Sequence, residues 1–253
     1  MKNKDLMKFY NKTFKKKDRI RQTSEFEEVL KETTWRDKTI LDVGCGTGKF
    51  AYIIAAKKGA KVLGVDYSKT AIESARRKYS HHNLTFKHLD ITRQITGKYD
   101  VIVSIGTLEH FDKPFKMLQI FKKHLNKGGI IIITSPNWSN PRGYILMCLY
   151  YLFNAPVTLA DLHYFTPIDF MNWAKKLQMQ LKWRTIEKSW AHGEQLIDDF
   201  RKRLPNVLSD TNLPNHKHGI KNFLTWLNEK IIPLDNSLSH SGAIGLYTFY
   251  NKS

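Results

Sequence analysis

The chain of 253 residues is 42% hydrophobic and 12% aromatic, which suffices for a large core and excludes an intrinsically disordered protein. Its two cysteines, Cys45 and Cys148, exclude a disulfide framework and a CxxC metal pair, so a cytoplasmic protein is expected. The formal net charge of +18 favours anionic partners such as nucleic acid, an anionic membrane surface or a phosphorylated small molecule.

The predicted elements begin with a basic, polar segment over residues 1–35, where scattered apolar positions indicate an N-terminal helical cap. From residue 39 onward, short apolar runs alternate with segments of helical periodicity. Strands are expected at residues 39–44, 61–66, 84–90, 99–106 and 130–136. Helices are expected at residues 49–59, 68–80 and 115–129.

This alternation predicts an α/β fold with a doubly wound, mostly parallel sheet, because right-handed crossovers place helices on both faces. Two later apolar runs, at residues 179–190 and 242–252, bring the expected number of strands to seven. Residues 136–176 interrupt the pattern and are interpreted as a helical insertion after strand five that shapes a substrate pocket. A second insertion is expected near residues 192–235, within a main domain that spans residues 36–253.

A glycine-rich turn follows the first strand, where Gly44, Gly46 and Gly48 alternate within the sequence LDVGCGTG. Such a turn between a strand and a helix lets a nucleotide ligand approach the backbone and the free N–H groups of the helix. The spacing differs from the G-x-G-x-x-G dinucleotide fingerprint, and Asp42 at the strand end would repel a pyrophosphate. A cationic ligand such as S-adenosylmethionine, with its sulfonium and ammonium groups, fits instead.

Two further acids stand at the ends of the next two strands. Asp66 follows Gly44 by 22 residues, where a carboxylate can accept hydrogen bonds from ribose hydroxyls. Asp90 closes the third strand and is expected to meet the adenine amino group, with Ile91 against the ring. The order of these residues and their places at strand ends predict a single S-adenosylmethionine site.

With these motifs the chain resembles the class I S-adenosylmethionine-dependent methyltransferases over residues 38–136. The resemblance implies a Rossmann-like methyltransferase fold and methyl transfer from S-adenosylmethionine. Tyr10 of the N-terminal cap is a candidate to close over the cofactor, with a simple docking helix as the alternative role of this segment. The full predicted cofactor set is Asp42, Gly44, Cys45, Gly46, Gly48, Asp66, Tyr67, Asp90, Ile91, Ser104 and Tyr10.

The sequence IGTLEHF after the fourth strand resembles the E-x-x-E-H segment of ubiquinone-biosynthesis O-methyltransferases. The resemblance makes Glu109 and His110 candidates for acid–base catalysis, with helix capping and packing under the cofactor as the alternative roles. Gly106 stands where the segment has its first glutamate. Because one oxygen ligand is thereby lost, no metal site is predicted.

A second candidate base is His163, in the sequence DLHYFTPIDF. The same O-methyltransferases carry a similar H…F-x-T-P element after strand five. Thr166, Pro167 and Asp169 fit the N-cap, N1 and N3 positions of a helix, which would place His163 on a loop at the open edge of the sheet. The alternative is a hydrogen-bonded hinge histidine.

Three functions are compatible with these residues. The leading hypothesis is an S-adenosylmethionine-dependent methyltransferase of a small molecule, with O-methylation by in-line transfer and a histidine base. The alternative is an RNA methyltransferase that binds phosphates with its basic surface, although no N-P-P-Y-like motif follows strand four. A binding protein that keeps only the cofactor site is the third. The apolar run 144–153, too short to span a bilayer, is compatible with a core helix, a substrate lid or peripheral contact with an anionic membrane.

Overall fold

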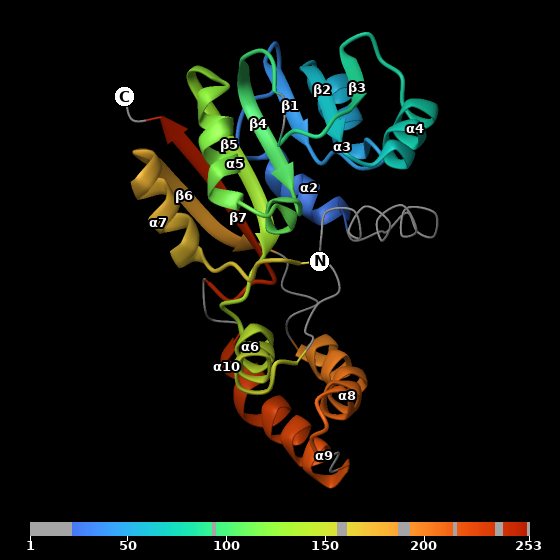
Figure 1. The fold of residues 1–253 in the computed structure, drawn as a ribbon, viewed down its shortest axis with the longest axis vertical. Coiled ribbons are helices and arrows are strands. Elements are labelled where there is room, and N and C mark those ends of the chain that lie inside the picture. Colours follow the sequence, from blue (N-terminus) through green and yellow to red (C-terminus); the bar gives the residue numbers. More distant parts are fainter. Residues whose placement is uncertain are drawn as a thin grey trace.

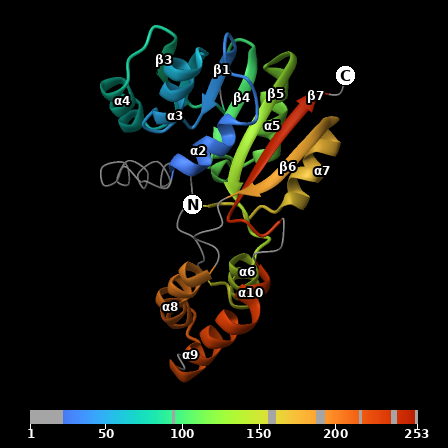
Figure 2. The same cartoon turned by 180° about the vertical axis from the view of Figure 1, so that it is seen from behind.

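The computed structural model describes residues 22–92, 95–155, 161–186, 193–214, 217–235 and 240–251. The strands are β1 (Thr39–Val43), β2 (Lys61–Asp66), β3 (Leu84–His88), β4 (Tyr99–Ile105), β5 (Leu125–Pro136), β6 (Met179–Ile186) and β7 (Ile244–Asn251). They form one sheet in the order β3-β2-β1-β4-β5-β7-β6 (Figures 1 and 2). β1 to β5 are parallel, and β7 is antiparallel to both neighbours. The predicted doubly wound, mostly parallel, seven-stranded fold is confirmed.

The helices that flank the sheet are α2 (Gln22–Leu30), α3 (Lys49–Tyr52) with the π-helical turn η1 (Ile53–Lys57), α4 (Lys69–Lys78), α5 (Pro114–Lys123) and α7 (Pro167–Leu177). They cover both faces, because successive strand residues point to opposite sides. Ile40 and Val101 belong to a core that includes residues of α2, α3 and α4. The next residue in each strand, Leu41 and Ile102, belongs to the core that includes residues of α5 and α7.

Several element boundaries differ from the sequence prediction. Asp90 does not close the third strand, because β3 ends at His88. The helix expected over residues 49–59 is α-helical only to Tyr52 and continues as the π-helical turn η1. The helix α5 ends at Lys123, ahead of the expected glycine stop, since β5 already pairs with β4 at Leu125. The pairing register then shifts, and Gly128 with φ 73° lies in the resulting strand irregularity instead of ending a helix.

The described part of the predicted N-terminal cap, α2, is anchored to β6 and β7. Arg184 of β6 forms ion pairs with Glu28 of α2 (3.1 Å) and with Glu32 just beyond it. Thr248 of β7 also donates a hydrogen bond to Glu32 (2.5 Å). These contacts fix the orientation of α2 on the sheet. Residues 1–21, which include Tyr10, lie outside the described residues.

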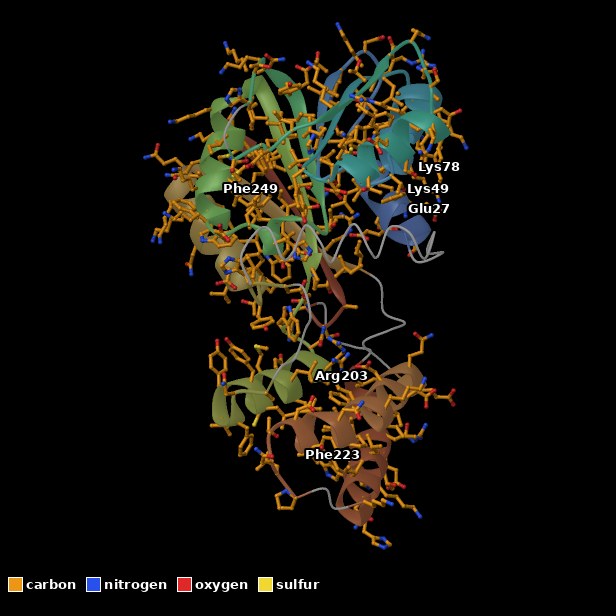
Figure 3. The ribbon with its side chains drawn as sticks, turned by 45° about the vertical axis from the view of Figure 1, so that its right-hand side comes forward. Glu27, Lys49, Lys78, Arg203, Phe223 and Phe249 are labelled. Atoms are coloured by element: carbon orange, nitrogen blue, oxygen red, sulfur yellow. The ribbon has the colours of Figure 1, made fainter. Side chains whose placement is uncertain are left out.

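A helical lobe lies beyond the carboxyl ends of the parallel strands (Figures 1 and 3). Its elements are α6 (Pro141–Phe153), α8 (Gly193–Asp210), α9 (Lys217–Trp226), η3 (Leu227–Ile231) and α10 (Ile232–Asp235). Leu146 of α6, Phe200 of α8 and Leu227 of η3 belong to a core of the lobe's own. The lobe thus joins helices from both predicted insertions, whereas α7 packs on β6. Among the described helices, none has the length and apolar character needed to traverse a bilayer.

Candidate active site

The turn between β1 and α3 has a backbone conformation that favours glycine. Gly44, Gly46 and Gly48 all have positive φ, at 72°, 53° and 84°. A Cβ atom at Gly44 would lie 2.4 Å from Thr107 Oγ1, and one at Gly48 would lie 2.5 Å from the Phe86 ring. Both the conformation of the turn and the space around it therefore require glycine.

Asp66, at the end of β2, holds this turn from the neighbouring strand. Its Oδ2 accepts a hydrogen bond from Gly46 N (2.9 Å), and its Oδ1 accepts one from Ser68 N (2.8 Å). Burial raises the pKa of Asp66, and these two hydrogen bonds oppose that shift because they favour the ionised form. A carboxylate has about four acceptor positions, so Asp66 can also accept hydrogen bonds from ligand hydroxyls.

Three buried polar atoms near the ends of β1, β2 and β4 lack a hydrogen-bond partner among the described residues: Asp42 Oδ2, Tyr67 OH and Ser104 Oγ. An unsatisfied buried polar atom costs about 1–3 kcal/mol, so such atoms call for a ligand or ordered water. Burial and the neighbouring Asp66 charge raise the pKa of Asp42 to about 7. A ligand with an ammonium group and several hydroxyls would satisfy these atoms, and S-adenosylmethionine has both.

The other predicted cofactor residues differ in how they are held. Burial, with the charges of Asp42 and Asp66, raises the pKa of Cys45, so its side chain is a thiol. Asp90 Oδ1 accepts hydrogen bonds from the backbone N (3.1 Å) and the hydroxyl (2.6 Å) of Thr92. Ile91 is buried in the core on the α5 side of the sheet.

Comparison with known proteins decides the family. A family model described as a methyltransferase domain matches residues 36–229. The chain belongs to the S-adenosylmethionine-dependent methyltransferases.

The curated proteins similar to this chain include ubiquinone biosynthesis O-methyltransferases. The one from Coxiella burnetii (strain Dugway 5J108-111) is 28% identical over 180 residues, or 68% of this chain and 74% of that protein. The one from Pseudomonas paraeruginosa is 26% identical over 154 residues. The aligned part is 57% of this chain and 66% of that protein. A chain in the complex between the Haloferax volcanii Trm112 methyltransferase activator and a methyltransferase superposes with a TM-score of 0.64 at 13% identity. That match covers 98% of this chain and 97% of the other, and shows a shared fold.

Replacing Asp66 by alanine is expected to weaken cofactor binding to this methyltransferase by about 1.5–3 kcal/mol, since a charged acceptor is lost. Calorimetry with S-adenosylhomocysteine measures the change. Asp66→Asn is the matched control, because it keeps an oxygen for Gly46 N and should lose less affinity. Unchanged affinity in a folded Asp66→Ala variant would show that other residues hold the ribose.

Cofactor binding should also depend on pH through Asp42. The pKa of this carboxyl is about 7 in the ligand-free protein, and a bound ammonium group would lower it. Affinity should therefore rise with pH up to about 7 and level off above it, with proton release on binding at pH near 6. Calorimetry in buffers of different ionisation enthalpy measures that release, which should vanish in Asp42→Asn. Equal proton release in the variant would assign the effect to another group.

Three titratable side chains meet beyond the ends of β4 and β5. Glu109 and His110 lie on the short helix η2 (Leu108–His110), and Asp161 comes from the loop before α7. His110 Nε2 is 3.9 Å from Glu109 Oε1, and His110 Nδ1 is 3.7 Å from Asp161 Oδ1. We call these three residues the acid–histidine cluster; one ligand atom from each lies within 4.8 Å of the other two.

The two acids of this cluster have different pKa values. Burial and the Asp161 charge raise the pKa of Glu109 to about 8, although Ser135 Oγ donates a hydrogen bond to its Oε2 (3.2 Å). Burial raises the pKa of Asp161 to about 6, against the opposing effect of Arg142. At pH 7 Glu109 is therefore mostly protonated and Asp161 mostly ionised. The ionised Asp161 therefore lies beside His110 Nδ1, and the protonated Glu109 lies beside His110 Nε2.

His163 is held differently from His110. Its Nε2 lies 2.9 Å from Phe111 O, so this nitrogen serves as a donor to the backbone. Its ring stacks on Phe165 with the centroids 5.4 Å apart. The predicted helix start is present, because Thr166 N donates to Asp169 Oδ2 (2.8 Å). These contacts favour the hinge role for His163 over that of a base.

Sequence reasoning missed Asp161 and Ser135. Neither stands in a recognisable motif, and Asp161 follows His110 by 51 residues in the sequence. Its loop returns to η2 because Leu162 N donates to Glu109 O (3.1 Å). The proximity of Asp161 to His163 in the sequence was the one available signal.

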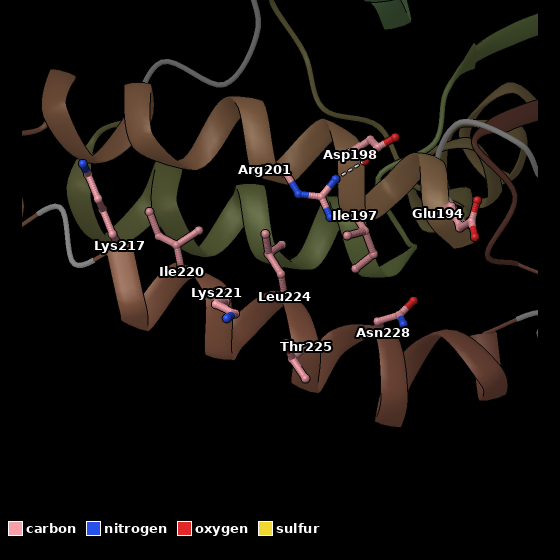
Figure 4. A pocket seen from close by; sticks show the side chains of 10 residues that line it. All are labelled: Glu194, Ile197, Asp198, Arg201, Lys217, Ile220, Lys221, Leu224, Thr225 and Asn228. Atoms are coloured by element: carbon pink, nitrogen blue, oxygen red, sulfur yellow. Dashed lines mark hydrogen bonds and ion pairs between the residues drawn. The ribbon is translucent and has the colours of Figure 1, made fainter.

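A groove of about 720 Å³ lies elsewhere, between α8 and α9 of the lobe (Figure 4). Ile197, Ile220 and Leu224 provide its apolar lining. Arg201 at its edge is paired with Asp198. All of its lining residues come from the lobe, so the groove is separate from the glycine turn and from the acid–histidine cluster.

Proposed function

We propose that this methyltransferase methylates a hydroxyl oxygen of a small molecule, with His110 as the general base. The observation that carries the proposal is the position of His110 between Glu109 and Asp161. The names of the ubiquinone-biosynthesis relatives support oxygen as the accepting atom. The hydrogen bond of His163 Nε2 to Phe111 O supports the choice of His110 over His163 as the base.

In this proposal one group of residues binds the cofactor, and a second group removes the proton from the acceptor. Bound S-adenosylmethionine would supply the activated methyl group and its leaving group. Asp42, Tyr67 and Ser104 would hold the cofactor through their unsatisfied atoms, and Asp66 would accept hydrogen bonds from the ribose. His110 would take the proton of the acceptor hydroxyl as its oxygen attacks, while ionised Asp161 stabilises the imidazolium that results.

The RNA alternative has weaker support. The net charge of +18 suits phosphate binding. The end of the sheet, however, carries the carboxyl groups of Glu25, on α2, and of Asp161, which would repel a phosphate backbone when ionised. The helical lobe lies beyond the ends of the parallel strands, where bound cofactor would meet the acceptor (Figure 1).

Transfer of a labelled methyl group tests the proposal, with phenolic and aliphatic alcohols and total RNA offered in parallel. Label in an alcohol is expected, and label in RNA alone would favour the alternative. Activity should survive EDTA, since proton sharing within the acid–histidine cluster needs no cation. Activity that EDTA abolishes and magnesium restores would show instead that Glu109, His110 and Asp161 hold a metal ion.

A further inference from the structure

The helix α6 exposes an apolar face to solvent. Tyr144, Cys148, Tyr151 and Leu152 follow the spacing of one helical face, and all four are exposed. The exposed fractions of Tyr151, Leu152 and Tyr144 are 76%, 69% and 56%. Leu146, between them in the sequence, is buried in the core of the lobe. The helix therefore anchors one side in the lobe and presents tyrosine and leucine on the other.

The helix α7 also exposes apolar side chains. Ile168 and Met171, one helical turn apart, are exposed to 61% and 46% near the start of α7. In Figure 1, α7 lies above α6 and to its left. We call Tyr144, Tyr151, Leu152, Ile168 and Met171 the apolar patch.

The surface above the apolar patch is basic. Lys175 and Lys176 of α7 and Lys116 and Lys123 of α5 are exposed. Lys176 Nζ lies 5.8 Å from the ring centroid of Phe115 on α5, so the two helices share one lysine-rich face. Neither helix has an acid other than Asp169, which caps α7. An apolar patch thus borders a positively charged surface.

We propose that the apolar patch and the lysines of α5 and α7 dock this enzyme on the surface of an anionic lipid bilayer. The 13 residues of α6 are too few to span a membrane, but a helix with one apolar face can lie in the interface, and tyrosine favours that position. Lysines beside it attract anionic headgroups. A second copy of the chain is a poorer occupant, because two molecules of charge +18 repel each other. The proposal does not depend on the acceptor chemistry proposed above.

Sedimentation with lipid vesicles tests this docking on the full chain. Vesicles of phosphatidylcholine are compared with vesicles in which about one third of the lipid is phosphatidylglycerol, at low and high salt. Binding is expected to the anionic vesicles and to weaken with salt. The double variant Tyr151→Asp/Leu152→Asp should bind about tenfold more weakly or worse, because its apolar contact with the interface is lost. Lys175→Glu/Lys176→Glu should weaken binding to anionic vesicles while leaving the apolar patch intact.

Control variants distinguish this docking from non-specific adsorption of the protein to vesicles. Trp226→Asp replaces another exposed aromatic residue, on α9, and should bind vesicles as the unchanged protein does. Each variant should keep its far-UV circular dichroism spectrum and its affinity for S-adenosylhomocysteine, which together show that the lobe and the sheet are folded. Unchanged vesicle binding in the Tyr151→Asp/Leu152→Asp variant would overturn the proposal, as would an equal loss in Trp226→Asp. A dimer in sedimentation velocity that this double variant dissociates would assign the patch to a second copy instead.

Discussion

Replacing His110 by alanine is expected to lower the turnover of labelled methyl transfer by about 10²–10⁴-fold, with affinity for S-adenosylhomocysteine nearly unchanged. The acceptor hydroxyl would keep its proton during attack, and no other imidazole stands between Glu109 and Asp161 in the described residues. Rate measurements under single-turnover conditions separate this chemical step from product release. A lower affinity with unchanged turnover would move His110 from catalysis to the cofactor site.

His163→Ala is the matched control for this experiment. It removes a hydrogen bond to Phe111 O and a stacking contact, so about 1 kcal/mol of stability should be lost with most of the turnover retained. Asp161→Asn should give an intermediate loss of turnover and a changed pH profile, because the charge beside His110 Nδ1 disappears. Severe loss in His163→Ala with normal turnover in His110→Ala would transfer the base to the loop before α7.

Replacing Gly44 by alanine is expected to weaken S-adenosylhomocysteine binding at least about 100-fold or to prevent folding. The residue has a φ of 72°, which costs an alanine about 1–2 kcal/mol. The new Cβ would also lie 2.4 Å from Thr107 Oγ1. Relief of such steric overlap costs about 1–3 kcal/mol more. Calorimetry and thermal melting of the same preparation distinguish a displaced turn from an unfolded protein.

Two further variants separate the backbone cost at Gly44 from the steric overlap with Thr107. Gly128→Ala has the same backbone cost, at a φ of 73°, but a Cβ there meets no atom within 4 Å. It should lower stability slightly and leave binding unchanged. The double variant Gly44→Ala/Thr107→Gly removes the steric overlap and should regain part of the affinity. If Gly128→Ala lowers binding as much as Gly44→Ala does, close packing of the turn is not the reason for its glycines.

The parts of this enzyme that the sequence predicted are those set by neighbouring residues. The turn at Gly44 to Gly48 and the acids that end β1 and β2 depend on a few consecutive positions, so their pattern is legible without a structure. The cap of α7 at Thr166 is equally local. Where β5 begins was misjudged, because pairing with β4 overrides the helical pattern that continues to Gly128.

Long-range relations were beyond sequence reasoning. The contact of Asp161 with His110 depends on the path of a loop that leaves α6 and returns to η2. Likewise, nothing in the apolar run of α6 indicates that its partners are α8 and η3, about 50 residues or more further on. Strand patterns also do not reveal that β7 enters between β5 and β6.

That last position of β7 has a consequence for synthesis of the chain on the ribosome. β6 pairs only with β7 among the described strands, so it has no hydrogen-bonding partner while β7 is still being translated. In the same way, the apolar residues of α6 remain uncovered until α8 and η3 have been translated. The nascent chain therefore carries an open edge on β6 until β7 has emerged, and an uncovered face on α6 until α8 and η3 have emerged. A premature stop late in the message would release a species prone to aggregation, although its cofactor turn has already been translated.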